Sequence, residues 1–172
     1  SILLVEPRAV ALISATKTFN LAALRNSSVL IPDEETRNRV KDEFYRRGID
    51  GINLFGVLAQ RVAYEQGGPW LDALLQYLDG TRAWVEQFLQ ANLPEIGFSH
   101  LQGTYLMWLD MRALGLEHSD LVRFLVDQAG LGLNSGLSFG EEGAGFMRLN
   151  IATPRANVVR AMEQLMKAVK AR

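Results

Sequence analysis

The stretch Ser-Ala-Thr-Lys-Thr-Phe-Asn at residues 14–20 decides how this 172-residue chain is interpreted. It follows a short, partly β-branched apolar run at residues 9–13, which predicts a buried strand of a parallel sheet. Lys17 then lies just past the carboxyl end of a strand, the edge at which ligands bind in open α/β sheets. Burial there favours the uncharged amine, which attacks carbonyl carbons as a Schiff-base nucleophile. The alternative is a lysine that ends a strand and points into water.

Hydroxyl groups surround this lysine. Ser14, Thr16 and Thr18 flank it in the sequence, and their side chains are able to hold an anion beside the amine. Hydroxyls in such a position also serve as local turn formers, because they hydrogen-bond neighbouring backbone groups. The residue pattern alone leaves both interpretations open.

A second informative stretch is Gly-Ala-Gly-Phe-Met-Arg-Leu-Asn-Ile-Ala-Thr-Pro-Arg at residues 143–155. Alternation over residues 146–152 predicts a strand with one apolar face, formed by Met147, Leu149 and Ile151. Arg148 and Asn150 then point the opposite way, and we expect them to face a cleft between domains. A rigidly held guanidinium binds an amino-acid α-carboxylate through two parallel N–H···O bonds. The alternative is an arginine salt-bridged on an exposed sheet face.

Together these stretches resemble two segments of the fold-type I pyridoxal-phosphate (PLP) enzymes. The similarity is to the class I/II aminotransferase-like family, in the branch of cystathionine β-lyase and other carbon–sulfur lyases. It implies that Lys17 holds PLP and acts as general base, and that Arg148 binds the substrate α-carboxylate. It further implies that Ser14, Thr16 and Arg25 meet the cofactor phosphate, although Arg25 is also explained by a surface salt bridge.

The same resemblance predicts the reaction and the assembly. We expect a carbon–sulfur β-lyase that converts cystathionine-like amino acids into pyruvate, ammonia and a thiol, working as a homodimer. An aminotransferase is the alternative, and a non-catalytic domain built from a truncated chain is the third. The resemblance covers the C-terminal portion of such enzymes, so we expect the missing half of the site to precede residue 1 and the 172-residue chain to be inactive alone.

The predicted fold class is α/β, with the end of a PLP-transferase-like large domain followed by a small α+β domain like that of aspartate aminotransferase. We expect residues 1–66 in the large domain, 67–92 as a long connecting helix and 93–172 as the small domain. In the first part, strands are predicted at 9–13 and 29–32, followed by helices at 34–47 and 51–66, the first capped by Asp33. The second helix is predicted to turn Val57, Leu58 and Val62 inward.

In the small domain we expect strands at 96–99, 104–110, 132–136 and 146–152, a helix at 119–129 and a closing helix. Thr153 is predicted to be the N-cap of the closing helix, and Tyr105 to pack in the core. A glycine-rich loop at 139–145 lacks the glycine spacing and the strand-to-helix context of a dinucleotide-binding fingerprint.

Composition restricts the other classes of function. The formal net charge is −1, which gives no electrostatic reason to expect nucleic acid or an anionic membrane as partner. There are no cysteines, so disulfides and thiolate chemistry are excluded, and a cytoplasmic location is compatible. With two histidines and no ligand-spaced partner for either, we expect no metal site.

Overall fold

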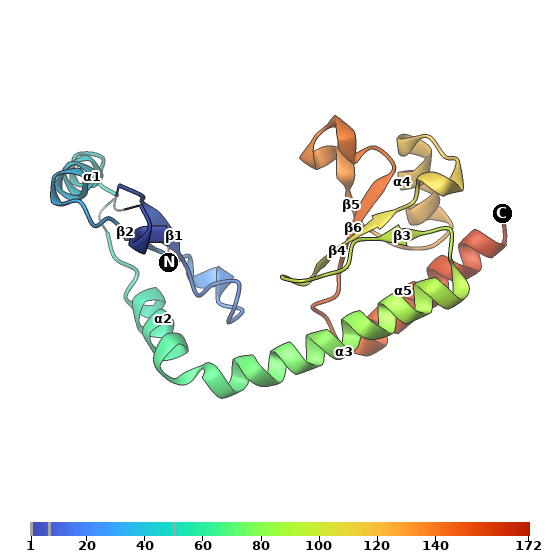
Figure 1. The fold of residues 1–172 in the computed structure, drawn as a ribbon, viewed down its shortest axis with the longest axis horizontal. Helices are drawn as coiled ribbons and strands as arrows, with labels where there is room; N and C mark the ends of the chain where they lie inside the picture. Colours follow the sequence, from blue (N-terminus) through green and yellow to red (C-terminus); the bar gives the residue numbers. More distant parts are fainter. Residues whose placement is uncertain (1, 7, 50) are drawn as a thin grey trace. The chain divides into compact units, whose positions relative to one another are not determined.

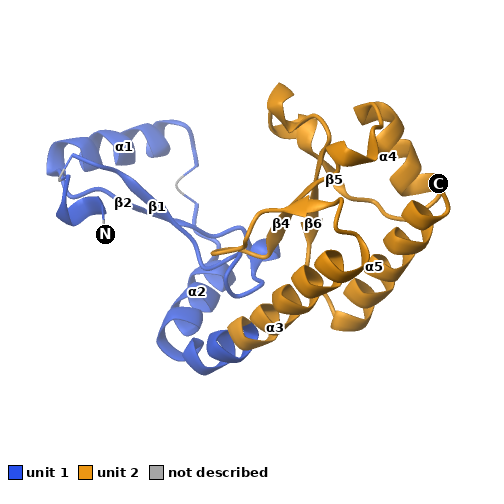
Figure 2. Cartoon of the chain, turned by 45° about the vertical axis from the view of Figure 1, so that its right-hand side comes forward, with its two compact units in different colours: residues 1–74 blue, residues 75–172 orange. Residues whose placement is uncertain are grey.

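The computed structural model describes residues 2–6, 8–49 and 51–172. The chain divides into two compact units, residues 1–74 and 75–172, and the division falls within the long helix α3 (Gly68–Asn92) (Figure 2). The sequence predicted a helix in this position. Within the described residues, none of the helices combines the length and apolarity needed to cross a membrane.

The first unit contains a two-stranded sheet and two helices. Strands β1 (Ala11–Ile13) and β2 (Ser28–Leu30) pair with Ala11 opposite Leu30. Helix α1 (Glu34–Arg46) begins at Asp33, whose carboxylate accepts the Thr36 N–H at 2.7 Å, and this bond lowers the pKa of Asp33 below its usual range. The predicted Asp33 cap is confirmed. Short 3₁₀ turns at Ile2–Leu4 and Ala22–Leu24 and helix α2 (Leu54–Gln66) complete the unit.

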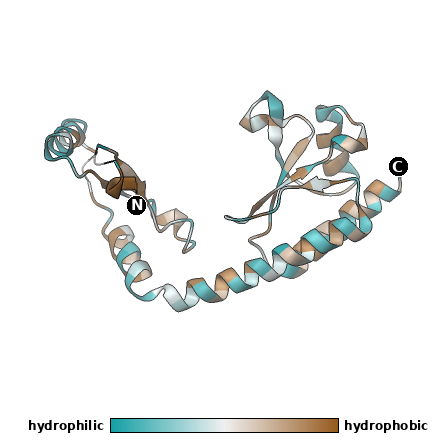
Figure 3. Cartoon of the chain, in the orientation of Figure 1, coloured by the Kyte–Doolittle hydropathy of each residue, from teal (hydrophilic) through white to brown (hydrophobic). Residues whose placement is uncertain are grey.

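The prediction of a buried, parallel strand before Lys17 is wrong. β1 and β2 are antiparallel, because residues 14–27 connect them through a loop and one 3₁₀ turn, whereas a parallel pair needs a crossover, usually a helix. The strands are apolar, as their brown colour in Figure 3 shows, yet Leu12 is 74% exposed. A two-stranded sheet cannot bury its apolar side chains without a covering layer.

The face of α2 that was predicted to pack inward is also exposed. Val57, Leu58 and Val62 all lie at the surface of their unit, and the buried residues of this helix are Gly56 and Ala63. The helix itself was predicted correctly, but an apolar pattern does not reveal whether another element covers the apolar side chains.

The second unit has two layers, a four-stranded antiparallel sheet and helices over one of its faces (Figure 1). The strand order is β3 (Gly97–Phe98), β4 (Leu106–Asp110), β6 (Phe146–Asn150), β5 (Asn134–Ser135). Inward side chains of the two central strands pack with those of α3, α4 (His118–Asp127) and α5 (Arg155–Lys170). Fully buried members of this core include Val85, Leu89, Met107, Leu109, Leu125, Met162 and Leu165.

The alternation predicted for the last strand is confirmed. Met147, Leu149 and Ile151 are buried, whereas Arg148 is half-buried and Asn150 is exposed on the opposite face. Tyr105 packs against the core, as expected.

The start of α5 differs from the prediction. Pro154 occupies the N-cap position, not Thr153, and has no side-chain oxygen to offer. The Tyr77 hydroxyl on α3 instead accepts the Arg155 N–H at 2.5 Å and donates to the Thr153 carbonyl at 3.3 Å. Arg155 Nε donates to Thr81 Oγ1 at 3.2 Å. A tyrosine from a neighbouring helix therefore supplies the cap that Thr153 was expected to provide.

Asp110, at the end of β4, makes the stability of this unit depend on pH. Its carboxylate accepts Nε and Nη2 of Arg112 at 2.9 and 2.7 Å, and these bonds lower the pKa of Asp110 in the folded protein. The unfolded carboxyl has the higher pKa, so the stabilisation is complete above the unfolded value and is lost as pH falls through the folded value.

We therefore expect Asp110→Asn to reduce the dependence of the urea unfolding midpoint on pH in the acid range. Asp127→Asn is the matched control, since Asp127 has no hydrogen bond or ion pair within the described chain. Identical pH profiles for wild type and Asp110→Asn would contradict the assignment.

Candidate functional site

The loop that carries Lys17 follows β1 directly. Backbone bonds from Phe19 N–H to the Ala15 carbonyl at 2.9 Å and from Leu21 N–H to the Thr16 carbonyl at 2.8 Å close it into a tight turn. The Lys17 side chain is exposed, so the burial expected for it is not observed. Among the described residues it has no hydrogen bond or ion pair, and its amine is available to a ligand.

The hydroxyls beside Lys17 bond to one another and to the loop. Ser14 Oγ donates to the Asn26 carbonyl at 2.7 Å and accepts the Thr16 N–H at 3.2 Å. The Ser14 and Thr16 hydroxyl oxygens are 2.8 Å apart, and since the Ser14 proton is already donated, Thr16 is the donor in this contact. Thr16 can turn its proton toward an anion without opening the loop, because Ser14 keeps the backbone N–H. Ser14 therefore has a structural role in the loop, and Thr16 is a hydroxyl donor that is available to an anion.

Arg25 closes the same loop in a left-handed conformation. It is the C-cap of the 3₁₀ turn at Ala22–Leu24 with φ of 47°, and Asn20 has φ of 56°. Non-glycine residues rarely adopt this region, and they gather at ligand sites where the surroundings hold them. The exposed Arg25 guanidinium makes no ion pair in the part of the chain that the structure describes, which excludes the predicted salt-bridge alternative there.

A polar network from α2 holds the loop in place. Gln60 accepts from Asn26 Nδ2 at 2.9 Å and donates to Ser28 Oγ at 2.8 Å. Asn53, the N-cap of α2, also donates its side-chain amide to the Leu24 carbonyl at 2.6 Å. Sequence reasoning missed Gln60, since a lone glutamine on a helix gives no local signal of a partner in another segment.

Arg148 lies in the centre of the open sheet face of the second unit. Its neighbours in register are Trp108 on β4 and Asn134 on β5. Arg148 Nη2 donates to Asn134 Oδ1 at 3.2 Å, and the guanidinium carbon lies 4.6 Å from the centre of the Phe139 ring. Arg148 Nε is buried and has no hydrogen-bond partner among the residues that the structure describes.

The charge of Arg148 is therefore not neutralised within its unit. No carboxylate pairs with it among the described residues, so the predicted alternative of a salt-bridged surface arginine does not hold for this part of the chain. Its partners are a neutral amide and an aromatic face, which leaves charge and donors for an anionic ligand. Asn150 is not part of this cluster, since its Oδ1 accepts the Ala152 N–H at 2.8 Å.

Lys17 and Arg148 belong to different units of the chain.

The described residues include no candidate metal site. His118 is a structural residue, with Nδ1 accepting the Gly145 N–H at 2.9 Å and Nε2 lying 2.6 Å from Ser135 Oγ. Across the described ranges, no group of three or more metal-ligating side chains occurs.

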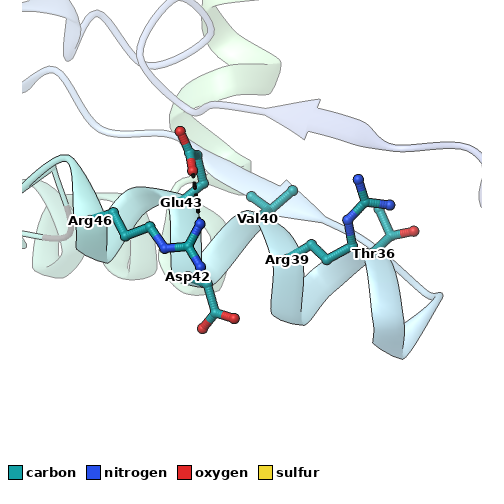
Figure 4. Close-up of a pocket in the computed structure, with 6 residues that line it drawn as sticks. All are labelled: Thr36, Arg39, Val40, Asp42, Glu43 and Arg46. Carbon is teal, nitrogen blue, oxygen red and sulfur yellow. Dashed lines mark ion pairs between the residues drawn. The ribbon is translucent and has the colours of Figure 1, made fainter.

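A hollow on α1 also lacks chemistry. Figure 4 shows its lining residues, Thr36, Arg39, Val40, Asp42, Glu43 and Arg46. All come from one helix, and Arg46 and Glu43 pair at 3.9 Å. The hollow is therefore part of a solvated, charged helix face, as expected for a helix whose charges alternate in sign.

Known proteins resemble this chain in fold and in sequence. No family model matches the chain. Cystalysin from Treponema denticola, whose structure contains pyridoxal 5'-phosphate, superposes with a TM-score of 0.91 at 29% identity, covering 99% of this chain and 44% of that one. The chain thus has an aminotransferase-like fold of the α/β class and aligns with the C-terminal ~40% of its structural neighbours.

Sequence comparison finds relatives that include named cystathionine β-lyases. The chain is 35% identical over 154 residues to cystathionine β-lyase PatB of Bacillus subtilis, covering 90% of this chain and 40% of the relative. It is 34% identical over 161 residues to protein MalY of Escherichia coli, covering 93% of this chain and 41% of the relative. The chain is a homologue of the cystathionine β-lyases and spans about two fifths of the length of these relatives.

The α2 network makes a specific prediction about the Lys17 loop. Gln60→Ala leaves Asn26 and Ser28 without their partner, so we expect the opening free energy of residues 14–28 to fall by about 1–2 kcal/mol. Hydrogen exchange of the loop amides in the full-length protein measures this change. Gln66→Ala on the same helix is the control, since Gln66 is exposed and makes no side-chain bond within the described chain. Equal protection in both variants would exclude the network as the support of the loop.

Proposed function

We propose that this chain carries the cofactor lysine and the carboxylate-binding arginine of a PLP-dependent carbon–sulfur β-lyase. The observation that supports this most concerns two cations, Lys17 and Arg148. Hydrogen bonds hold the loop of Lys17 and the side chain of Arg148, and neither cation has a carboxylate partner in the described chain. Unpaired cations that the fold holds in place favour binding over stability as their role. The homologues named cystathionine β-lyase favour this branch.

The residues of the first unit fit the cofactor. PLP presents an aldehyde and a doubly charged phosphate, and the loop offers a free primary amine and a free guanidinium within one short segment. We assign Lys17 to the aldehyde, and Arg25 and Thr16 to the phosphate, since Arg25 makes no ion pair in the described chain and Thr16 can turn its proton from Ser14 toward an anion. Ser14 contributes to the same group by holding Thr16 and the Asn26 carbonyl in position.

Bound PLP would supply the electron sink that stabilises negative charge at the substrate Cα. Arg148 would bind the substrate α-carboxylate through paired N–H groups and so fix the orientation of Cα. The substrate amino group would take the place of the Lys17 amine on the aldehyde. The freed Lys17 amine would then lie within reach of Cα and would accept the Cα proton as general base. The Cα–H electrons would form a Cα–Cβ double bond while the Cβ–S electrons leave with sulfur, and the sulfur would take a proton from the Lys17 ammonium to be released as a thiol. Hydrolysis of the remaining enamine would give pyruvate and ammonia.

An amino acid is therefore the proposed substrate, with cystathionine-like thioethers as the preferred class. We also propose that the protein works as a homodimer, and that residues 1–66, 67–92 and 93–172 are the end of the large domain, the connecting helix and the small domain. An aminotransferase would use the same Lys17 and Arg148 but return the proton to the cofactor.

Pyruvate release separates these reactions. We expect full-length protein supplied with PLP and L-cystathionine to release pyruvate continuously without any keto acid, because elimination needs no acceptor. Lys17→Ala should abolish this release. Turnover of amino acids only after a keto acid is added would identify an aminotransferase, and no turnover under either condition would favour a non-catalytic protein.

A further inference from the structure

The glycine-rich segment 136–145 has no part in the function proposed so far, yet it is firmly built. Gly136 and Gly143 lie back to back, so that a Cβ on either would overlap the carbonyl oxygen of the other. Residues at its two ends are held by His118, which contacts Ser135 Oγ and the Gly145 N–H. The segment is a compact double turn fixed at both ends.

This segment places one aromatic ring over Arg148. Phe139, at the end of the first 3₁₀ turn (Gly136–Phe139), lies 4.6 Å from the guanidinium carbon, measured to the ring centre. Trp108 supports that ring edge-on, with centres 5.2 Å apart and planes at 80°. Phe139 is 53% exposed, so its ring contributes little to the core. Among the described residues, its ring contacts are with Trp108 and its cation contact is with Arg148.

We propose that segment 136–145 positions the substrate-binding arginine, and that Phe139 is the positioning residue which does so, together with Asn134. This inference rests on the proposed function of Arg148. A carboxylate partner would hold the arginine equally well, but it would neutralise the charge and use the paired N–H groups. An aromatic face holds the guanidinium without using any N–H donor, and Asn134 uses one hydrogen of Nη2.

The proposal explains the state of each guanidinium nitrogen. Nε is buried and unpartnered, Nη2 has one hydrogen bound to Asn134, and no bond from Nη1 occurs among the described residues. The end of the guanidinium, with Nη1 and the second hydrogen of Nη2, remains for two parallel bonds to a carboxylate. Holding the side chain in this rotamer before binding lowers the entropy lost when substrate binds.

Phe139→Leu in the full-length, PLP-loaded protein tests this role. We expect KM for the amino-acid substrate to rise roughly 3- to 30-fold with kcat changed less than about twofold, since only a cation–π contact is lost. Phe139→Tyr keeps the ring and should restore KM. Arg148→Ala gives the upper limit of the effect.

Phe146→Leu is the matched control. Phe146 lies on the same sheet face and its ring also meets Trp108, but its cation is Arg112, at 4.7 Å. KM should stay at the wild-type value in this variant. In addition, the Arg148 Nε–H resonance should shift in Phe139→Leu, where the ring current is lost, and not in Phe139→Tyr.

The outcomes distinguish the positioning role of Phe139 from the proposed function on which it rests. Wild-type turnover with equal KM in Phe139→Leu and Phe146→Leu would overturn the positioning role and leave the proposed function intact. A shifted Arg148 resonance with unchanged KM would overturn it too, since the contact would then exist without serving the substrate. Absence of turnover in the wild type, with and without a keto acid, would remove the proposed function itself.

Discussion

Burial of one face of the four-stranded sheet determines the strand register of the second unit and the position of Arg148. Met107 and Leu109 of β4 and Met147 and Leu149 of β6 all turn toward the helices, and each is at most 5% exposed. Because side chains alternate along a strand, this burial puts Arg148 and its register neighbour Trp108 on the open face. A slip of one residue would exchange the two sets, so the free energy of the core also fixes the position of the arginine.

The first unit depends on a different kind of interaction. Its buried residues are few, and the Lys17 loop is held by polar contacts of Ser14, Asn26 and Gln60 rather than by an apolar core. Hydrogen bonds fix directions closely while leaving the loop at the surface. The loop therefore presents Lys17 to solvent while hydrogen bonds hold the backbone on both sides of it.

The periodic features of the sequence predicted the structure best. Alternation of apolar residues located β6 and the side of the strand on which Arg148 lies, and the acidic cap Asp33 located the start of α1. The predictions that were wrong share one cause. A local sequence pattern does not show which distant segment will pack against an element. The antiparallel pairing of β1, the exposure of Lys17 and the exposed α2 face all depend on what covers an element. The cap of α5 comes from Tyr77, on a helix that is adjacent in space but far away in the sequence.

The sequence also contained no sign of the residues that support the candidate site. Gln60, Asn134 and Phe139 belong to no motif, and only the folded chain brings them to the loop or to Arg148. By contrast, Lys17 and Arg148 stand in stretches whose residue patterns resemble segments of a known enzyme family. The sequence therefore pointed to these two candidate residues, but not to the side chains that hold them in place.

The central claim is that Lys17 is the residue that holds the cofactor. Borohydride reduction of the PLP-loaded full-length protein, followed by peptide mass spectrometry, tests it most directly because reduction makes the lysine linkage permanent. We predict a phosphopyridoxyl group on the peptide that contains Lys17, at one group per chain. Stoichiometric labelling of Lys41, Lys167, Lys170 or any other lysine, with Lys17 unmodified, would contradict the account.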